Sequence, residues 1–427
     1  MDIHQCSHGD APPGGRVCVH LPSEGSDRGA YRWFIGDGER YDLVCAACRN
    51  GMPDVARHLR AVCQACFDGV RGRCYLAGFA GSLPVRERAS ALSFAHADVD
   101  MRGALPARIV TLRPLVASPE GAWIALSATR EIVRLDPAAG TVTTLATLPT
   151  SVPLSGDVAL HLSSDGHFAA IVETYGRRGV VINLETGAET MRLERDDYHC
   201  DVSVFPTAFF AHAERTLLAH GTAWNRLDIS DPATGHLLTT REPASYGQGE
   251  ARPPHYLDYF HSGLTVSPDG EWIADNGWVW QPVGVVRAWS LRRWIDDNPW
   301  ESEDGPTCRD ICDHDDWDKP LCWIDNRRLA VWGYQEPEPP VVRVFDVPSG
   351  REAAAFVGPL GDLVYDAYLF SFAPDLGTSV WDIETGERLL RDTTFAPTAY
   401  HPMARQFITL LPDGAVRLSR LRGNDPT

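Results

Sequence analysis

A repeated unit occupies the C-terminal three quarters of the chain and constrains the fold more than any other sequence feature. Each unit opens with a turn such as Ser267-Pro268-Asp269-Gly270, continues with an apolar run, and contains a second turn such as Thr186-Gly187. Asp-Gly and Thr-Gly turns supply residues that tolerate positive φ, and the β-branched runs between them favour antiparallel strands. The units begin near Ser118, Ser164, His212, Ser267, Asp325, Tyr365 and His401.

These units follow one another at intervals close to the roughly 40–45 residues of a four-stranded propeller blade. A single blade cannot bury both of its faces, so the blades must stack around a shared axis. We therefore predict an all-β fold in which residues 108–427 form a seven-bladed β-propeller. Such a ring closes when a strand from one terminus completes the blade formed by the other, and Ala91–Val99 and Arg108–Leu112 are both candidates for that strand.

Two segments resemble a known superfamily: Val266–Ala274 reads VSPDGEWIA, and Val380–Glu387 reads VWDIETGE. This wording is similar to that of bacterial WD40-like and YVTN-type propellers. The resemblance covers the repeated part of the chain and implies a fold, not an activity. The units lack the regular Gly-His element before their first strand, and only one unit ends a strand with a Trp-Asp dipeptide, Trp381-Asp382. We therefore do not expect the histidine–aspartate network of regular WD40 repeats.

Residues 1–75 read differently, because seven of the 11 cysteines lie in the first 74 residues. Two CxxC pairs stand in this segment, and a CxxC turn presents two thiolates to one tetrahedral zinc ion. The segment is similar to zinc-ribbon or treble-clef modules, and its apolar spacing predicts a short helix over Pro53–Arg60, with Val55, Leu59 and Val62 on one face. We predict a structural zinc ion with the ligands Cys45, Cys48, Cys63 and Cys66.

Further metal ligands are predicted upstream, at Cys18 and His20. A CxH pair followed by two CxxC pairs resembles cross-braced fingers that hold two ions, in which Cys6, His8 and Cys74 are additional candidates. Two alternatives remain open. The alternative to zinc binding is that both CxxC pairs are reduced and metal-free. The alternative to a ligand role for Cys18 is that it is buried as a small hydrophobic residue of a strand. A redox role is less favoured, because two neighbouring CxxC pairs are more typical of metal binding.

Between the cysteine-rich module and the propeller, residues 76–107 are predicted to form a linker that includes the possible ring-closing strand. A second irregular segment, residues 292–322, is predicted as an insertion between blades 4 and 5. A second metal site there is possible, but its ligand spacing matches no known pattern, and we favour an acidic, solvated loop. The candidate ligands of that site are Cys308, Cys312, His314 and Cys322.

The formal charge of −18 is concentrated in the propeller, because residues 1–90 hold 11 arginines and 10 acidic residues. An acidic surface repels phosphate backbones and anionic membranes, so nucleic acid is an unfavourable partner. No apolar run is long enough to span a membrane, and the N-terminus lacks a secretory signal, so we expect a cytoplasmic protein. Lys319 is the single lysine against 38 arginines, which indicates a GC-rich, bacterial genome.

Catalytic motifs such as a nucleophile elbow, a P-loop or HExxH are absent from the sequence, and we expect a protein that is not an enzyme. The leading hypothesis is a protein–protein interaction scaffold, in which the propeller recruits a protein or peptide and zinc stabilises the module. One alternative is a metal-dependent propeller hydrolase or lactonase, which needs inward carboxylate and asparagine ligands for a metal at the central channel. His199, His255, Asp258 and His261 are candidates to meet at the channel mouth, although some proximity is expected by chance among 15 histidines and 57 acidic residues. Another is nucleic-acid binding through the zinc module. The aromatic segment Arg252–Gly263 (RPPHYLDYFHSG) is either a binding hot spot or buried packing. Nothing in the sequence indicates the oligomeric state.

Overall fold

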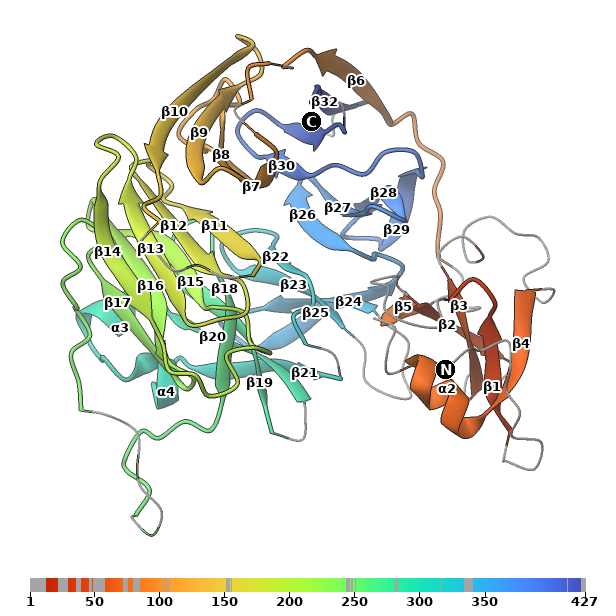
Figure 1. The fold of residues 1–427 in the computed structure, drawn as a ribbon. Helices are drawn as coiled ribbons and strands as arrows, with labels where there is room; N and C mark the ends of the chain where they lie inside the picture. Colours follow the sequence, from red (N-terminus) through yellow and green to blue (C-terminus); the bar gives the residue numbers. More distant parts are fainter. Residues whose placement is uncertain are drawn as a thin grey trace.

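Seven antiparallel sheets surround a common axis in the computed structural model of the protein (Figure 1). The predicted all-β, seven-bladed propeller is confirmed. The structure describes residues 13–21, 30–35, 40–45, 48, 58–71, 76–79, 85–101, 103–105, 107–150, 154, 156–242, 246, 249, 251–280, 283–315, 317–333, 341–412 and 414–423.

The first three blades are formed by consecutive strands, in order from the axis outward. Blade 1 contains β7 (Ile109–Pro114), β8 (Trp123–Ser127), β9 (Glu131–Asp136) and β10 (Thr141–Thr147). Blade 2 contains β11 (Val158–Leu162), β12 (Phe168–Glu173), β13 (Arg178–Asn183) and β14 (Glu189–Glu194). Blade 3 contains three strands, β15 (Thr207–His212), β16 (Arg215–Ala223) and β17 (Arg226–Ser230).

The remaining blades have four strands each. Blade 4 contains β18 (Phe260–Val266), β19 (Trp272–Val279), β20 (Val283–Ser290) and β21 (Arg309–His314). Blade 5 contains β22 (Leu321–Trp323), β23 (Arg328–Gly333), β24 (Val341–Asp346) and β25 (Arg351–Val357). Blade 6 contains β26 (Asp362–Asp366), β27 (Tyr368–Ala373), β28 (Gly377–Asp382) and β29 (Glu387–Asp392). Blade 7 contains β30 (Ala399–His401), β31 (Gln406–Leu410), β32 (Val416–Arg422) and β6 (Ser93–Val99).

The Ser-Pro-Asp-Gly signal forms the turn between the first and second strands of a blade. In blade 4, the Ser267 hydroxyl donates to Asp269 (2.6 Å) and accepts from the Trp272 amide (3.0 Å). Gly270 sits at φ +77°, where a side chain would be strained. The same bonds recur in blade 2 around Ser163, so the sequence repeat reflects a repeated turn geometry.

Both faces of the second strand in each blade are buried, which explains the long apolar runs in the sequence. In β12, Ala169 and Ile171 pack toward blade 1, whereas Phe168, Ala170 and Val172 pack toward blade 3. Successive side chains of a strand point to opposite faces, so a strand between two neighbours needs apolar residues at every position. Each pair of neighbouring blades shares one such apolar cluster, and the clusters together run around the whole ring.

The ring is closed by β6, which comes from the N-terminal side and forms the outer strand of blade 7 (Figure 1). β6 pairs with β32 in antiparallel register from Ser93↔Arg422 to Val99↔Val416. The Arg417 guanidinium binds Asp98 at 2.6 and 3.0 Å across this pair. Of the two candidates for the ring-closing strand, the structure therefore uses the first, and the second becomes β7, the inner strand of blade 1.

The segment just before β6 is bonded to blade 6. Glu87 forms a parallel bridge with Arg388 of β29, the Arg88 amide donates to the Arg388 carbonyl (3.0 Å), and the Ser90 hydroxyl donates to the Leu389 carbonyl (2.7 Å). The Arg88 guanidinium also binds Asp382 at 2.6 Å. The N-terminal segment thus joins blade 6 to blade 7.

We predict that the thermal stability of the propeller depends on this closing segment. A chain beginning at residue 103 lacks β6 and leaves the edge of β32 unpaired, whereas a chain beginning at residue 85 keeps both β6 and the bonds to blade 6. By calorimetry, the shorter chain should melt at least about 5 °C below the longer one. Equal melting temperatures would show that β6 is dispensable for the ring.

The N-terminal part forms a separate five-stranded sheet in the order β4-β1-β3-β2-β5, beside blades 5 and 6 in Figure 1. Its central strands β1 and β3 are parallel, and β4 is antiparallel to β1. Its apolar cluster is continuous with the cluster between blades 5 and 6. Its elements are β1 (Pro13–Cys18), β2 (Ala30–Ile35), β3 (Arg40–Cys45), β4 (Leu59–Cys63), α2 (Gln64–Arg71) and β5 (Leu76–Phe79).

The prediction of a helix over Pro53–Arg60 is wrong at the C-terminal end of that range. Leu59 lies on strand β4, as does Val62, which was placed on the same helical face. β4 is hydrogen-bonded to β1, with Leu59 opposite Cys18. The apolar spacing of this segment suits a helix or a strand, and the pairing with β1 favours the strand. The helix of the module, α2, instead follows the second CxxC pair. Residues 49–57 lie outside the described part of the chain.

The prediction of a solvated loop at residues 292–322 is also wrong, because this segment forms regular elements and is partly buried. It forms α3 (Leu291–Asp296), α4 (Glu301–Asp304), the outer strand β21 of blade 4 and the start of β22. Glu301 and Glu303 are buried in spite of their charge. The Glu301 carboxylate is satisfied by the Thr307 amide (2.8 Å), so the acidic residues serve the packing of the insertion.

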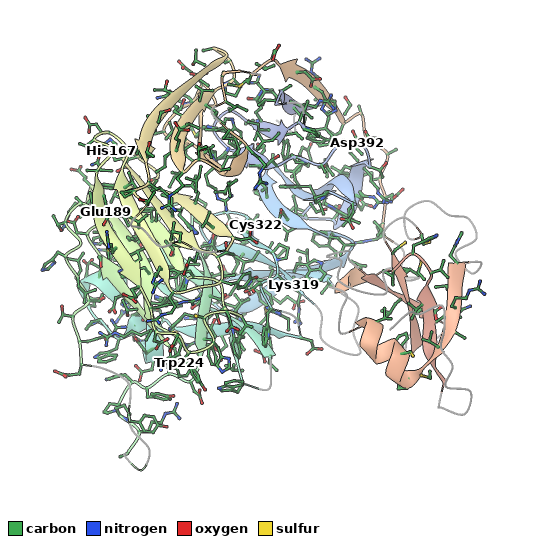
Figure 2. The ribbon with its side chains drawn as sticks, viewed as in Figure 1. His167, Glu189, Trp224, Lys319, Cys322 and Asp392 are labelled. Atoms are coloured by element: carbon green, nitrogen blue, oxygen red, sulfur yellow. The ribbon has the colours of Figure 1, made fainter. Side chains whose placement is uncertain are left out.

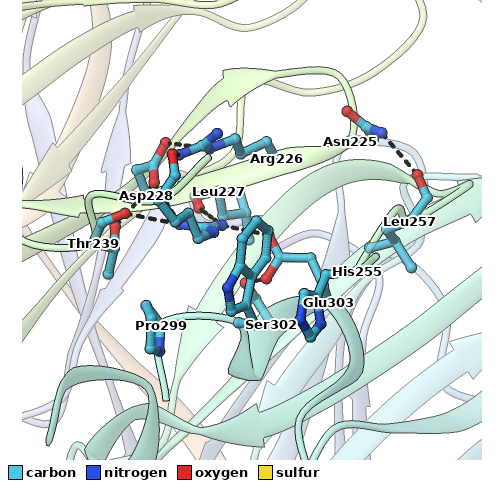
Figure 3. Close-up of polar contacts among 12 residues, drawn as sticks. Asn225, Arg226, Leu227, Asp228, Thr239, His255, Leu257, Pro299, Ser302 and Glu303 are labelled. Atoms are coloured by element: carbon cyan, nitrogen blue, oxygen red, sulfur yellow. Dashed lines mark hydrogen bonds and ion pairs between the residues drawn. The ribbon is translucent and has the colours of Figure 1, made fainter. Parts of the chain in front are cut away.

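α4 supports blade 3, in which the described residues form no regular fourth strand (Figure 3). In its place, Leu237 forms a single bridge to Ser230 of β17, and the Thr239 hydroxyl accepts from the Ile229 amide (2.9 Å). The buried Arg241 guanidinium then binds Asp228 of β17 (2.6 Å) and Glu303 of α4. Arg241 therefore attaches this irregular edge to the neighbouring blade.

Substitution of Arg241 should be strongly destabilising. Arg241→Met leaves two buried carboxylates without their shared cation, and we expect a loss of about 3–5 kcal/mol in the free energy of unfolding. Arg343→Met is the matched control, because the Arg343–Glu352 pair is partly exposed and should contribute less than about 1 kcal/mol. Chemical denaturation of both variants tests this, and equal losses would contradict it.

Candidate functional site

The first candidate site is a cluster of Cys18, His20, Cys45 and Cys48 in the N-terminal sheet. Cys18 is the last residue of β1 and Cys45 is the last residue of β3. Because these strands are parallel, with Val17 opposite Leu43, their C-terminal ends lie side by side. His20 and Cys48, which follow the two strands by two and three residues, supply the other two ligands.

An ion pair between the partly exposed Arg16 and the buried Asp42 fixes the register of β1 and β3. The Arg16 guanidinium binds the Asp42 carboxylate at 3.0 and 2.6 Å, and the Arg16 amide donates to the same carboxylate (3.1 Å). Asp42 is only 1% exposed. Since Cys18 and Cys45 follow these residues closely, a slip of either strand would move one sulfur away from the other.

The ligand atoms of the cluster are spaced as a tetrahedral metal ion requires. The Cys18 sulfur lies 3.6 Å from the Cys45 sulfur and 3.4 Å from the Cys48 sulfur. The Nδ1 atom of His20 lies 3.4, 3.8 and 3.2 Å from the sulfurs of Cys18, Cys45 and Cys48. Bonds of about 2.3 Å to sulfur and 2.0 Å to nitrogen space tetrahedral ligands by about 3.5–3.8 Å. These sulfurs are too far apart for a disulfide.

The electrostatics of the three thiols also favour a cation. The hydrogen bond with Cys45 lowers the pKa of Cys18, and the same contact, together with burial, raises the pKa of Cys45 to about 12. Burial raises the pKa of Cys48. The cluster thus stabilises one thiolate and resists further negative charge. A divalent cation would supply the charge that allows all three sulfurs to ionise.

The second CxxC pair lies away from this cluster. β4 runs antiparallel to β1, so Cys63 lies opposite Pro13 at the start of β1, whereas Cys18 lies at its end. Five residues at about 3.3 Å each separate the two ends by roughly 16 Å. Cys63 and Cys66 are buried, at the end of β4 and in α2. The further predicted ligands Cys6, His8 and Cys74 lie outside the described residues.

The cysteines of the insertion are not gathered into a comparable cluster among the residues that the structure describes. Cys308 precedes β21, Cys312 and His314 are on β21, and Cys322 is on the inner strand β22, toward the middle of the ring in Figure 2. Burial raises the pKa of Cys308, Cys312 and Cys322 to about 12, which keeps these thiols protonated.

Substitution of a cluster residue should remove one metal equivalent per chain. We expect Cys45→Ser to contain one zinc equivalent less than the wild type, and Cys312→Ser to contain as much as the wild type, when zinc is measured by elemental analysis after purification with zinc present. Because loss of the ion also removes its bonds to the other ligands, Cys45→Ser should unfold at a lower temperature. Equal zinc content in both variants would contradict the cluster as a metal site.

The second candidate site is an aromatic surface at one end of blades 2, 3 and 4. Strands within a blade are antiparallel, so the turn between its second and third strands and the connection to the next blade emerge at the same end. We call this group of rings the aromatic face. Its members, of which Phe260 and Trp278 are buried, are Tyr175, Tyr198, His199, Trp224, Tyr246, Tyr256, Phe260, Trp278, Trp280 and Trp317. Figure 2 labels Trp224 at the blade 3 end of this surface.

Four rings of the aromatic face form a continuous stack. Tyr198 stacks on Phe260 at 5.7 Å, Phe260 on Trp278 at 3.8 Å, and Trp278 on Trp317 at 4.5 Å, with interplanar angles of 18°, 2° and 16°. Trp280 stands nearly perpendicular to this stack, at 89° to Phe260. The indole of Trp278 is also fixed by its hydrogen bond to the Ser203 hydroxyl (3.0 Å).

A buried arginine holds the loop that presents Tyr198. Arg195 donates to the carbonyls of Gly176, Cys200, Ser203 and Val204, at 2.8, 3.1, 2.6 and 3.4 Å. Burial lowers the pKa of Arg195 to about 10, which still leaves the guanidinium charged at neutral pH. The loop is therefore rigid around a fixed cation, and Tyr198 is held in place before any partner arrives.

The aromatic segment Arg252–Gly263, for which a binding hot spot and buried packing were the two alternatives, contributes mostly packing. Tyr259 and Phe260 are buried, and the Tyr259 hydroxyl donates to the Val285 carbonyl (2.9 Å). The exposed rings instead come from Tyr175, Tyr198, Tyr246 and Trp280, which sequence reasoning missed. Trp280 lies in the turn directly after β19, so the alternation of the strand does not reveal its exposure.

The histidines expected to meet at the channel mouth have separate partners. His255 pairs with Asp304 at 2.8 Å, whereas the buried His261 pairs with Asp275 at 2.5 Å. His199 packs edge-on against Trp280 in the aromatic face. Within the described ranges, the Cys18 cluster is the sole group of three or more potential ligands this close together. The hydrolase hypothesis thus gains no ligand set from the structure.

Comparison with known proteins adds little. The sequence matches no protein-family profile and no curated protein. Among solved structures, the chain is similar to a chain in the crystal structure of a mitotic checkpoint complex, with 15% identity and a TM-score of 0.48; the match covers 79% of this chain and 94% of that one. Within the described residues, no helix has the length and apolar character needed to span a membrane.

Proposed function

We propose that this protein is an interaction scaffold, whose propeller binds a protein or peptide partner through the aromatic face. The observation that supports the proposal is the exposure of Tyr175, Tyr198, Tyr246 and Trp280, each between 43% and 48% exposed. They are the only aromatic residues among the exposed large hydrophobic side chains of the described residues, and all four belong to one face. Grouped exposed aromatic rings are typical of binding surfaces.

The rigidity of this face supports binding further. The rings are held by stacking and by hydrogen bonds to a closed ring of sheets, so little conformational entropy remains to be lost when a partner binds. Tyrosine and tryptophan provide large contact areas with few rotatable bonds. A rigid, partly exposed aromatic surface is therefore suited to recognition and has no evident role in folding at its exposed rings.

The metal that we propose for the cysteine cluster is zinc, with a structural role. Three thiolates and one imidazole match the ligands of structural zinc sites, and four protein ligands complete the tetrahedron without an open position for a substrate. Thiolate ligands require a reducing environment, so a cytoplasmic setting is part of the proposal. Cys63 and Cys66 remain proposed ligands of a separate ion.

Affinity capture with the full-length protein tests the scaffold function. The wild type should enrich a protein from a lysate of the source organism, identified by mass spectrometry. Tyr198→Ala combined with Trp280→Ala should lose that protein, whereas Met403→Ala should keep it. Met403 is 57% exposed in the turn between β30 and β31, at the opposite end of the blades.

Three outcomes are informative. Loss of the partner in the double variant alone supports the aromatic face. Equal retention by all variants contradicts binding at this face, and a wild type that enriches nothing contradicts the scaffold function. Circular dichroism of each variant shows whether the fold is intact.

A further inference from the structure

We propose that the aromatic face recognises arginine in its partner, with the guanidinium stacked on Trp280 or Tyr198 and hydrogen-bonded to adjacent aspartates. This inference rests on the proposed function and specifies the chemistry of the partner. It is drawn from the geometry of the exposed rings, the charges beside them and a similar contact within the chain itself.

Tyr198 and Trp280 both contact the ring of His199, at centroid distances of 4.6 and 4.8 Å, and each keeps part of its own ring exposed. Tyr198 is 46% exposed at the end of the four-ring stack, and Trp280 is 47% exposed. Their planes meet at 71° with centroids 6.4 Å apart. A planar guanidinium can lie over one ring while the edge of the other remains beside it. The negative face of an aromatic ring attracts a cation within about 6 Å of its centroid, and tryptophan attracts it most strongly.

Exposed carboxylates lie in the loops that supply these rings. Asp197, next to Tyr198, has an 81% exposed side chain, and its nearest cation, Arg177, is 3.9 Å away and is shared with Glu194. Asp201 and Asp258 are also exposed, in the two loops that supply Tyr198 and Tyr256. Together with the net charge of −18, these groups favour a cationic partner and disfavour a phosphate-bearing one.

The chain forms the proposed contact within the aromatic face itself. The Arg252 guanidinium lies over the Tyr256 ring, 4.6 Å from its centroid, and donates to the Tyr256 carbonyl (3.2 Å). Tyr256 in turn contacts Trp224 and Tyr246 of the same surface. An arginine from a partner would repeat this contact on Tyr198 or Trp280.

The same chemistry distinguishes arginine from lysine. A guanidinium is planar and weakly hydrated, so it can stack on a ring and still direct its N–H groups at a carboxylate in the plane. An ammonium group is compact and strongly hydrated, and it cannot do both. The aromatic face should therefore select arginine over lysine, whereas a purely electrostatic attraction would treat the two alike.

A direct binding measurement tests this selection. The full-length protein is titrated against short fluorescein-labelled peptides of alternating glycine and arginine, and against the corresponding lysine and glutamate peptides, in about 150 mM salt, where long-range attraction is screened. Fluorescence anisotropy should show saturable binding of the arginine peptide, weaker binding of the lysine peptide and none of the glutamate peptide.

Variants locate the binding. Trp280→Ala should weaken binding of the arginine peptide by roughly 2- to 30-fold, and Trp280→Phe should weaken it less, because phenylalanine keeps an aromatic face. Asp197→Asn should weaken it by a smaller factor, and Met403→Ala should leave it unchanged. Each of these residues is exposed, and intact circular dichroism spectra exclude misfolding.

Equal affinity for the arginine and lysine peptides, no saturable binding of the arginine peptide, or unchanged binding of that peptide by the Tyr198→Ala and Trp280→Ala double variant would each overturn the inference. The proposed function can survive such a result: if the captured partner is still lost from the Tyr198→Ala and Trp280→Ala double variant, the face binds a partner by other chemistry. If no partner is captured by the wild type and no peptide binds, both proposals fail together.

Discussion

Burial of both faces of every blade against its neighbours is the constraint on which the rest of the structure depends. A strand such as β12 is apolar at each position because alternate side chains enter the two neighbouring seams. Such a blade is unstable alone, and an incomplete ring would expose an apolar face and an unpaired strand edge at once. Pairing of β6 with β32 removes both problems. The edge of blade 3 must also be covered. In place of a regular fourth strand, a bridge at Leu237 and a buried ion pair through Arg241 cover it.

The closing strand also determines where the N-terminal module lies. The chain leaves the module, pairs with β29 through Glu87 and Arg88, and then enters blade 7 as β6. The apolar cluster of the module continues into the seam between blades 5 and 6. A zinc ion at the proposed site would order the ends of β1 and β3, whose other side chains, Val17 and Leu43, belong to that cluster. The module and the propeller are therefore coupled through packing as well as through the chain.

The sequence predicted the features that depend on local interactions. The Ser-Pro-Asp-Gly turns were identifiable because Ser267 and Asp269 bond within a few residues. Pairings between distant segments were less accessible: Leu59 and Val62 suit a helix until β1 supplies a partner strand. The CxxC pairs suggested one four-cysteine site, but the antiparallel direction of β4 places Cys63 at the far end of β1. Cys18 and His20 were predicted as ligands, yet their union with Cys45 and Cys48 depends on a parallel pairing that spacing alone does not reveal.

The aromatic face was the least accessible to sequence reasoning, because its rings come from separate loops and strand ends that the ring brings to one end of three blades. Because the rings come from several separate segments, each ring is held by a different part of the propeller, and the surface stays rigid. Tyr198 rests on Phe260 and Trp278, whose strands are fixed in blade 4, while Arg195 closes the loop of Tyr198 around four carbonyls. The strong interactions lie beneath the surface, so the outer rings need no partner to remain in place. Exposure of such rings carries a cost in water, and the proposed binding surface would account for both their rigidity and their exposure.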